Sequence, residues 1–371
     1  MIPVSEPVLS SNARKYVMDC LDTGWISSGG KYLNKFEDVW AKYCNVKYGI
    51  SVTNGTSALQ IAVKALDLPR GSEIIMPSYT IISCAIAIIE AGCIPVLVDC
   101  DLDTWCMSVE AVEEKVTSKT RAIMPVHMFG HPVDMDPIIS IAEKHGLYII
   151  EDAAEAHGAE YKGRKVGGLG HIACFSFYAN KLITTGEGGM VVTDDDKLAE
   201  RLRSLRNLGF RSDRRFLHTE IGYNCRMTNI QAAIGLSQVE MIDRHVEIKR
   251  RNAAIYTGKL LDLDIPATLP IEKVWGRSVF WMYGIVLKEH VSISAPEFAD
   301  LLWDQGVETR PLFLGMHQQP IFQRMGLFND EFYPNTDLLA EKGLYLPSGL
   351  GLDEKQIMEV CSAVELVLKP F

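Results

Sequence analysis

Residues 134–152, DMDPIISIAEKHGLYIIED, contain the pattern that decides the fold. The first part predicts an amphipathic helix over residues 135–145, because Asp134 can cap its start and Gly146 can end it. Residues 147–152 then form a short apolar run that does not alternate with polar residues. Such a run predicts a strand that is covered on both faces. The stretch therefore predicts one helix–strand unit of an α/β sheet.

The same unit recurs on both sides of this stretch. Further short apolar runs predict strands at residues 49–53, 73–77, 94–98, 122–127, 173–177 and 189–193. Amphipathic helices fill most of the gaps, with residues 109–116 as another clear example. Alternation of strands and helices predicts the α/β class with a mainly parallel, open sheet. Ligands of such sheets bind at the carboxyl ends of the strands.

The pattern changes after Asn229. We expect one long helix from residue 230 to about 261, strands at 279–287 and 307–312, and helices at 295–305 and 354–368. A chain of 371 residues is too long for one ordinary core. The sequence therefore predicts a large domain over residues 1–245 and a smaller C-terminal α/β domain over residues 246–371.

Composition and charge narrow the class of protein. Hydrophobic residues make up 47% of the chain and charged residues 23%, which is typical of a soluble globular protein. The net charge of -10 argues against nucleic acid and against an anionic membrane surface. The most basic segment, residues 201–215, is either a solvated helix and loop or a wall for the phosphates of a ligand.

Cysteine usage and the N-terminus indicate a cytoplasmic protein. The nine cysteines are scattered singly, which argues against a disulfide framework and a structural zinc site. The N-terminus lacks the pattern of a signal peptide, and residues 81–98 divide into a helix and a strand rather than a membrane span. His127 and His131 fall at a strand end, where their spacing does not favour a metal site.

A lysine follows the predicted strand at 173–177, in residues 176–189, SFYANKLITTGEGG. A lysine amine forms a Schiff base with an aldehyde when the amine is partly desolvated. Pyridoxal phosphate enzymes use such a lysine, together with a carboxylate that faces the ring nitrogen. Lys181 is thus the candidate catalytic residue, although a lysine in this position is more often on the surface.

Two further segments supply partners for a pyridoxal phosphate lysine. Asp152 ends an apolar strand, where an acid needs a cation such as a protonated ring nitrogen, but it also suits a helix N-cap. Residues 53–59, TNGTSAL, predict a strand-to-helix turn whose free amides and helix dipole favour an anion. An ordinary turn fits them as well, and they lack the P-loop signature.

These segments occur together and in this order in the DegT/DnrJ/EryC1 family of sugar aminotransferases, a branch of the fold-type I pyridoxal phosphate enzymes. The chain resembles that family over nearly its whole length. The resemblance is carried by GWISS at 24–28, NGT at 54–56, PVH at 125–127, EDAAEA at 151–156, TTGEGGM at 184–190 and GYNCRMTN at 222–229. Together these stretches are a specific signature.

The resemblance implies which residues surround the cofactor ring. Lys181 would hold pyridoxal phosphate and then act as general base and acid, and Asp152 would pair with the ring nitrogen. Glu155 would lie near the phenolic oxygen, where two close anions require that one carries a proton or shares a water. Ile81 stands where the family usually has a stacking aromatic residue, so it can pack on the ring but not stack.

The resemblance also implies how the phosphate is bound. Thr56, Ser57 and Ser176 would hold the phosphate of the cofactor within one subunit. Asn224 would reach the phosphate of the neighbouring subunit's cofactor. The active unit would therefore be a homodimer with shared active sites.

The substrates are implied in the same way. Trp25, Ser27, Arg226 and His317 would lie near a nucleotide-linked keto sugar, although His317 also suits an ordinary loop histidine. L-glutamate would donate the amino group, and GDP-4-keto-6-deoxymannose is the expected acceptor, with GDP-perosamine as a precursor of surface polysaccharide. A dTDP- or UDP-linked keto sugar or a smaller keto compound is the alternative.

Two other functions are compatible with this fold. Sugar dehydratases of the same family carry histidine at the position of Lys181, so the lysine argues against a dehydratase. A non-catalytic sensor has no need of the set formed by Lys181, Asp152, Ser176 and Asn224, so the intact set argues for an enzyme.

Overall fold

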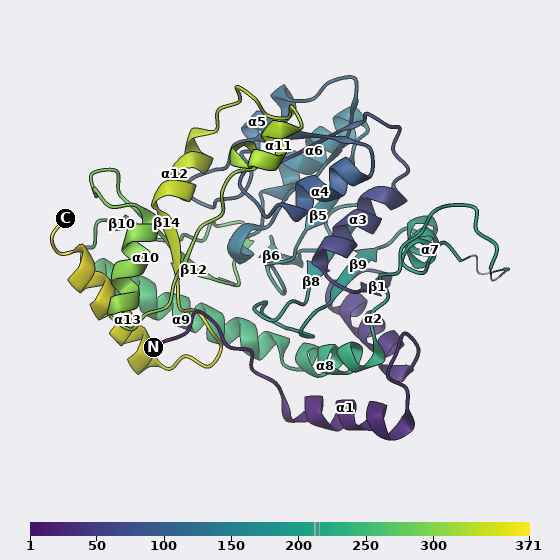
Figure 1. The fold of residues 1–371 in the computed structure, drawn as a ribbon, viewed down its shortest axis with the longest axis horizontal. Coiled ribbons are helices and arrows are strands. Elements are labelled where there is room, and N and C mark those ends of the chain that lie inside the picture. The colour runs from purple at the N-terminus through teal and green to yellow at the C-terminus, as the bar shows by residue number, and fades with distance from the viewer. Residues whose placement is uncertain (211–212, 215) are drawn as a thin grey trace.

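The computed structural model describes residues 1–210, 213–214 and 216–371. A seven-stranded sheet forms its centre, in the order β1-β9-β8-β5-β4-β2-β3 (Figure 1). Its strands are β1 (Tyr48–Val52), β2 (Glu73–Pro77), β3 (Ile94–Val98), β4 (Thr120–Ile123), β5 (Tyr148–Asp152), β8 (Ile172–Ser176) and β9 (Gly189–Thr193). Strand β9 is antiparallel to both of its neighbours, and the other pairs are parallel. The predicted α/β class with a mainly parallel sheet is confirmed.

Helices connect the strands of this sheet. They are α3 (Gly55–Ala65), α4 (Ser83–Glu90), α5 (Glu110–Glu114) and α6 (Met135–His145), whereas α7 (Asp196–Leu205) follows β9, the last strand of this sheet along the chain. Helix α6 has the predicted bounds and ends at Gly146, whose φ of 64° suits glycine. The predicted cap is wrong, because the Asp134 side chain does not bind the helix amides and instead accepts a hydrogen bond from the Tyr161 hydroxyl at 2.6 Å. The 109–116 helix is shorter than predicted.

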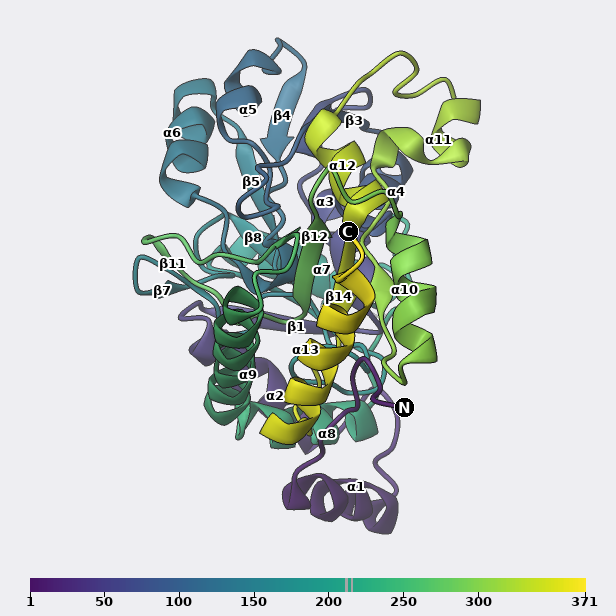
Figure 2. The same cartoon turned by 90° about the vertical axis from the view of Figure 1, so that its left-hand side faces the viewer.

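Two helices stand where one was predicted at 230–261. Helix α8 (Asn229–Val239) ends before Glu240, and α9 (Ile242–Asp262) begins after Met241. Helix α1 (Ser11–Thr23) lies beside α8 and extends from the body of the molecule (Figures 1 and 2). Asn12 and Tyr16 of α1 each donate a hydrogen bond of 2.7 Å to the Glu240 carboxylate. The break between α8 and α9 therefore coincides with a tertiary contact, and the local sequence at 230–261 contains no sign of that contact. Helix α2 (Lys31–Tyr43) follows α1.

The C-terminal region contains a second, antiparallel sheet in the order β10-β12-β14-β13. Its strands are β10 (Ala267–Thr268), β12 (Tyr283–Leu287), β14 (Gly343–Leu346) and β13 (Arg310–Pro311), accompanied by α10 (Ala295–Asp304), α11 (Pro320–Arg324), α12 (Pro334–Lys342) and α13 (Glu354–Leu368). A small sheet joins β11 (Gly276–Arg277), β6 (Glu160–Tyr161) and β7 (Arg164–Lys165), and short 3-10 helices lie at Met128–Gly130 and Met316–Gln318. The strands predicted at 279–287 and 307–312 are shorter than expected, and Val307 instead forms a bridge with Ile2.

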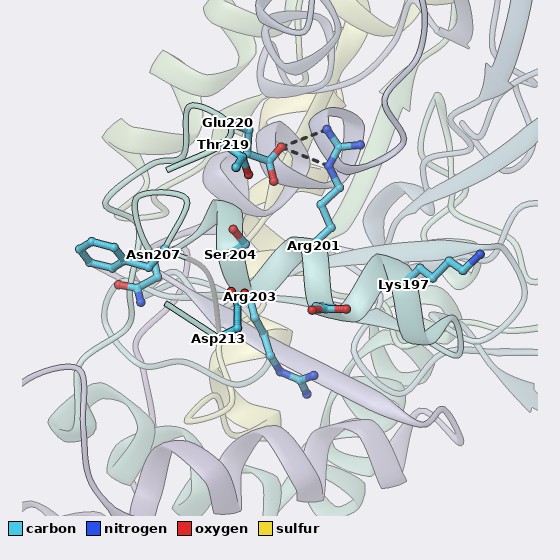
Figure 3. A pocket seen from close by; sticks show the side chains of 10 residues that line it. Lys197, Arg201, Arg203, Ser204, Asn207, Asp213, Thr219 and Glu220 are labelled. Carbon is cyan, nitrogen blue, oxygen red and sulfur yellow. Dashed lines mark hydrogen bonds and ion pairs between the residues drawn. The ribbon is translucent and has the colours of Figure 1, made fainter. Parts of the chain in front are cut away.

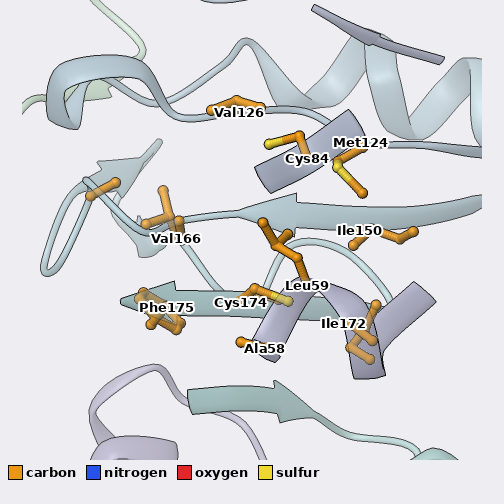
Figure 4. Close-up of a cluster of buried hydrophobic side chains, with 14 of the residues drawn as sticks. Ala58, Leu59, Cys84, Met124, Val126, Ile150, Val166, Ile172, Cys174 and Phe175 are labelled. Carbon is orange, nitrogen blue, oxygen red and sulfur yellow. The ribbon is translucent and has the colours of Figure 1, made fainter. Parts of the chain in front are cut away.

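Buried side chains form two clusters. The larger one surrounds the central sheet (Figure 4), and the smaller one surrounds the C-terminal sheet. Helix α9 contributes Val246 to the first cluster and Tyr256 to the second. Leu312 and Tyr345 belong to the larger cluster although they come late in the chain. The proposed division at residues 245 and 246 therefore falls inside a helix shared by both clusters, and it stays a prediction.

The nine cysteines are all free and buried. Among the helices that the structure describes, none is both long and apolar enough to cross a membrane.

Candidate active site

Lys181 lies in the loop between β8 and β9 and is held on two sides. Its side chain is only 12% exposed, and its Nζ is 3.5 Å from Oε1 of Glu155. The same Nζ lies 3.8 Å from the centre of the Trp281 ring. The Trp281 indole nitrogen donates a hydrogen bond of 2.8 Å to the carbonyl of Asn180. Lys181 is therefore a largely buried lysine next to an acid and an aromatic face, and not a surface residue.

Glu155 is buried beside this amine. Its Oε2 accepts a hydrogen bond of 2.9 Å from the amide of Phe129. Phe129 has a φ of 51°, a left-handed conformation that is uncommon for a residue with a side chain. Burial raises the pKa of Glu155, Asp152 adds to the increase, and Lys181 and the Phe129 amide oppose it. Glu155 is therefore suited to hold a proton.

Asp152 is the last residue of β5 and is 2% exposed. Its Oδ1 accepts a hydrogen bond from the Ala154 amide, and its Oδ2 accepts one from the Cys84 thiol, both at 3.0 Å. Residues 153–159 form turns rather than a helix, so the N-cap interpretation is wrong. No basic side chain in the described part of the chain forms an ion pair with this carboxylate. A buried anion of this kind calls for a cation.

Glu151, the preceding acid, has a different environment because alternate residues of a strand face opposite sides. Its carboxylate accepts hydrogen bonds from the amides of Gly167, Leu169 and Gly170 at 2.8, 2.8 and 2.6 Å. It also lies 3.1 Å from Nε2 of His127. Burial alone would raise the pKa of Glu151, but these hydrogen bonds outweigh burial and lower it. Glu151 therefore anchors the loop at residues 167–170 as an anion.

His127 and His131, which flank the 3-10 helix at Met128–Gly130 after β4, form hydrogen bonds within the protein. Nδ1 of His127 accepts a hydrogen bond of 3.1 Å from the amide of Val133, and Nδ1 of His131 lies 2.8 Å from the carbonyl of Pro132. Among the described residues, no group of three or more histidine, cysteine or acidic side chains is arranged to hold a metal ion.

The turn between β1 and α3 forms the next part of the site. Asn54 caps α3 by accepting the Ser57 amide at 2.8 Å, and the Ser57 hydroxyl is 3.1 Å from that of Thr53. A Cβ atom on Gly55 would lie 2.7 Å from Cβ of Ser176, so only glycine fits there. The close approach brings the start of α3, with its free amides, against the Ser176 side chain at the end of β8.

The start of helix α4 contacts both the start of α3 and the Asp152 carboxylate. The Thr56 hydroxyl lies 2.8 Å from the hydroxyl of Ser83, the first residue of α4, and the next residue, Cys84, binds Asp152. Ile81, just before the helix, is 43% exposed, whereas Tyr79 is fully buried with its ring centre 6.0 Å from that of Phe313. Tyr79 is thus a core residue and does not replace the missing stacking aromatic.

The loop that carries Trp25 and Ser27 is held by Asn229. The Asn229 side chain donates a hydrogen bond of 2.7 Å to the Trp25 carbonyl, and the Asn229 amide donates one of 2.6 Å to the Ser27 carbonyl. Trp25 is 61% exposed, and Asn224 is exposed as well. Arg226 donates a hydrogen bond of 2.8 Å to Asn207. Within the part of the chain that the structure describes, no hydrogen bond or ion pair joins these residues to Lys181.

His317 is buried and both ring nitrogens have partners. Nδ1 lies 2.8 Å from the Ser78 hydroxyl, and Nε2 lies 2.9 Å from Oδ1 of Asp337. His317 is therefore not a free loop histidine, and its contact with Ser78 places it near the carboxyl end of β2. Its predicted role toward the substrate stays a prediction.

Described residues of the basic segment at 201–215, among them Arg201 and Arg203, line a hollow of about 1030 Å³ (Figure 3). Arg201, which lines it, forms ion pairs with Asp67 at 3.0 Å and Glu220 at 3.1 Å. Arg206 is bound to Glu37. The charges of these two arginines are therefore partly neutralised within the protein, which favours a structural role for them. Arg211 and Arg215 lie outside the described residues.

Several residues of this site were not predicted from the sequence. They are Trp281 against Lys181, Phe129 against Glu155, Ser83 against Thr56 and Cys84 against Asp152. Each contact joins segments far apart in the chain, and no local pattern marks them.

The residues fit pyridoxal phosphate. Lys181 would hold the aldehyde of the cofactor, and the start of α3 with Ser176 would hold its phosphate. The protonated ring nitrogen would be the cation that the buried Asp152 carboxylate needs. When bound, the cofactor supplies an electron sink for the carbon that carries the amino nitrogen. A largely buried lysine, a buried acid without an ion-pair partner among the described residues and a helix start suited to an anion, all on one mainly parallel sheet, are typical of a fold-type I pyridoxal phosphate enzyme.

The chain belongs to the DegT/DnrJ/EryC1/StrS aminotransferase family, whose model matches residues 7–365. It is therefore a pyridoxal phosphate-dependent aminotransferase, as the resemblance implied.

Three relatives are similar over almost their whole lengths. A GDP-perosamine synthase from Caulobacter vibrioides is 44% identical, covering 99% of this chain and 98% of the relative. The GDP-perosamine synthase of Escherichia coli O157:H7 is 41% identical, with 98% and 97% covered. That of Vibrio cholerae is 37% identical, with 98% of each covered.

Solved structures of aminotransferases show the same fold. Helicobacter pylori PseC, an aminotransferase involved in the biosynthesis of pseudoaminic acid, superposes with a TM-score of 0.94 at 26% identity and covers 100% of both chains. DesV from S. venezuelae has a TM-score of 0.88 at 34% identity, with 95% of this chain and 93% of DesV covered.

Proposed function

We propose that this enzyme transfers the amino group of L-glutamate to the C4 ketone of GDP-4-keto-6-deoxymannose and so forms GDP-perosamine. The observation that carries the proposal is the similarity of the whole chain, at 37% to 44% identity, to three GDP-perosamine synthases. The site supports it because an amino transfer needs one base that both removes and returns a proton. Lys181 lies after β8, and its amine is held between an acid and an aromatic ring.

Lys181 is the proton carrier in this proposal. Its amine accepts the proton that leaves the amino-bearing carbon of the donor. It then returns this proton to the carbon on the other side of the transferred nitrogen. Glu155, 3.5 Å away, keeps the amine in place, and the Trp281 ring covers it from water. Water exclusion strengthens the interactions of a charged group and prevents the proton from exchanging with solvent.

Asp152 and the start of α3 orient the cofactor. Asp152 has free lone pairs besides those used by Ala154 and Cys84, so it can accept a ring N–H. The unpaired amides at the start of α3 and the hydroxyls of Thr56, Ser57 and Ser176 provide donors for a phosphate.

The sugar nucleotide would lie toward Trp25, Ser27, Arg226 and His317. A hollow of about 370 Å³ supports this placement, because it is lined by Ser28 next to Ser27 and by the Arg203 and Arg226 side chains. Guanidinium groups are well suited to a diphosphate. Ile81 stands where the family usually has an aromatic residue that stacks on the cofactor ring. Because the chain departs from the family pattern at this position, a keto sugar on a different nucleotide is the second candidate.

We further propose a homodimer in which Asn224 completes the partner's site. Exposed apolar residues support it, since Ile221 is 84% exposed next to exposed Tyr223 and Asn224. Met18 and Leu21 on the protruding helix α1 are exposed too. Exposed apolar side chains of this kind favour burial against a second copy. The nine free thiols support the proposal that the enzyme works in the reducing cytoplasm.

Mass spectrometry tests the reaction. Purified enzyme with pyridoxal phosphate, L-glutamate and GDP-4-keto-6-deoxymannose is expected to give an aminated GDP-sugar, and the Lys181→Ala variant is expected to give none. Bleaching of the cofactor by glutamate without an aminated product would contradict the GDP-sugar and leave a dTDP- or UDP-linked sugar to be tested in the same way. Absence of bleaching would contradict L-glutamate as the donor.

Mixing two inactive variants tests the shared site. In a heterodimer of Lys181→Ala and Asn224→Ala subunits, one site combines an intact Lys181 with an intact Asn224. Random exchange should restore about a quarter of the wild-type activity. Unchanged inactivity of the mixture, with exchange shown by light scattering of differently sized fusions, would contradict a site that uses both subunits.

A further inference from the structure

Cys84 contacts the carboxylate that the proposed mechanism assigns to the cofactor ring. The residue is fully buried within the larger core cluster, which also contains Met124, Val126 and Ile150 (Figure 4). Its thiol donates to Oδ2 of Asp152 with a sulfur–oxygen distance of 3.0 Å. Cys84 is thus a side chain that acts directly on Asp152 from a separate helix.

The first turn of α4 reaches two parts of the site at once. Ser83 lies 2.8 Å from Thr56 on the proposed phosphate side, and Cys84 lies 3.0 Å from Asp152 on the proposed ring side. Because the two residues are adjacent at the rigid start of a helix, the position of Asp152 is tied to the position of the phosphate cradle. The Cys84 thiol is therefore placed to orient the carboxylate as well as to pack against it.

The thiol keeps its proton in this environment. Burial raises the pKa of Cys84 well above its ordinary value, and the charge of Asp152 adds to the increase. The single S–H bond is used toward Asp152, so the Thr80 hydroxyl, 3.5 Å from the sulfur, can act as donor to it. The order Thr80, Cys84, Asp152 then forms a chain of donors that ends on the carboxylate.

We propose that Cys84 is a positioning residue for pyridoxal phosphate, which holds the Asp152 carboxylate in the orientation that meets the ring nitrogen. The inference rests on the proposed role of Asp152. A thiol is a weak donor, so it orients the oxygen while withdrawing little of its negative charge. That charge remains available for the ring N–H.

The chain offers a matched control thiol. Cys174 of β8 is buried and pairs in register with Asp152, yet its thiol makes no hydrogen bond to that carboxylate within the described structure. Cys174→Ala removes the same atoms next to the same strand without removing a donor to Asp152. It separates loss of a thiol from loss of the hydrogen bond.

The test measures cofactor binding and absorbance in the full-length protein. Apoenzymes of wild type, C84S, C84A, C84V, C174A and D152N are titrated with pyridoxal phosphate, and thermal unfolding checks that each is folded. We expect about tenfold weaker binding and an altered absorbance–pH curve in C84A and C84V, which lack a donor. C84S, whose hydroxyl can donate, should stay within about threefold of wild type, as should C174A.

Three outcomes would overturn the inference. Wild-type binding and absorbance in both C84A and C84V, alongside a defective D152N, would overturn the role of Cys84 and leave that of Asp152 intact. A defect in C84V alone would show that volume and not the donor matters. A D152N variant identical to wild type would overturn the role of Asp152 itself, and with it that of Cys84.

Discussion

The Lys181 amine lies 3.8 Å from the centre of the Trp281 ring, while the Trp281 indole nitrogen donates to the Asn180 carbonyl at 2.8 Å. One tryptophan therefore covers the amine and also fixes the backbone just before it. The ring comes from the segment that leads into β12, so the C-terminal half of the chain shapes the environment of the lysine that we propose as catalytic.

This relationship predicts the effect of substitutions at Trp281. Trp281→Phe keeps an aromatic face but loses the bond to Asn180, and we expect a three- to tenfold slower half-reaction with L-glutamate, from about 1 kcal/mol. Trp281→Leu loses the cation–π contact as well and should be slower still. Stopped-flow absorbance of the cofactor measures both rates. A leucine variant as fast as the phenylalanine variant would contradict a role for the ring.

Replacement of Lys181 should abolish the reaction. Lys181→Ala removes the proton carrier, and we expect the half-reaction to slow by at least about 10⁴-fold. Lys181→Arg keeps a positive charge but cannot give up its proton, so it should be equally inactive. The exposed Lys197 offers a control, and Lys197→Ala should keep the wild-type rate. Rapid bleaching by glutamate in Lys181→Arg would contradict the assignment.

The close approach of Gly55 to Ser176 predicts that even one methyl group is harmful. Gly55→Ala would place Cβ 2.7 Å from Cβ of Ser176, so α3 and β8 must move apart. We expect about 1–3 kcal/mol lower stability and weaker binding of pyridoxal phosphate. Gly258→Ala, where no atom lies within 4 Å, is the control and should be neutral or slightly stabilising. Thermal unfolding and cofactor titration measure the two effects, and equal behaviour of both variants would refute the clash.

Glu155 should make the stability of the apoenzyme depend on pH. Its pKa is raised in the folded protein, mainly by burial, so the folded state binds a proton more readily than the unfolded state. The free energy of unfolding should therefore fall as pH rises above about 4.3, the ordinary glutamate value. In Glu155→Gln this fall should be smaller. Thermal midpoints of apoenzyme between pH 4 and pH 8 measure it, and parallel curves for the two proteins would contradict the prediction.

Lys249 should make the free energy of unfolding rise with pH in the alkaline range, which is opposite to the effect of Glu155. It is buried on α9, where its amine donates to the carbonyl and the hydroxyl of Ser348, and burial lowers the pKa of Lys249 to about 7. The unfolded chain, with an ordinary value of about 10.4, binds more protons between these two pH values. The free energy of unfolding should therefore rise from about pH 7 to pH 10. Lys249→Met should show a smaller rise, whereas the exposed Lys197→Met should match wild type in thermal denaturation curves.

Local sequence patterns determined the elements of this protein. The run at 147–152 became β5 and residues 135–145 became α6, because period and end signals act over a few residues. Lys181 and Asp152 were predicted as site residues for a similar reason, since Asp152 ends an apolar strand and Lys181 lies in the loop that follows another. The single helix predicted at 230–261 was wrong, and its break at Glu240 coincides with hydrogen bonds from α1, which lies far away in the sequence.

Only the tertiary structure decided what surrounds those residues. Trp281 covers Lys181, Cys84 binds Asp152, and Ser78 and Asp337 occupy the ring nitrogens of His317. Each of these contacts joins distant parts of the chain, and its existence depends on how helices and strands pack rather than on which residues neighbour each other. Sequence by itself therefore predicted which side chains would perform the chemistry, whereas packing decided their solvation and their hydrogen-bond partners.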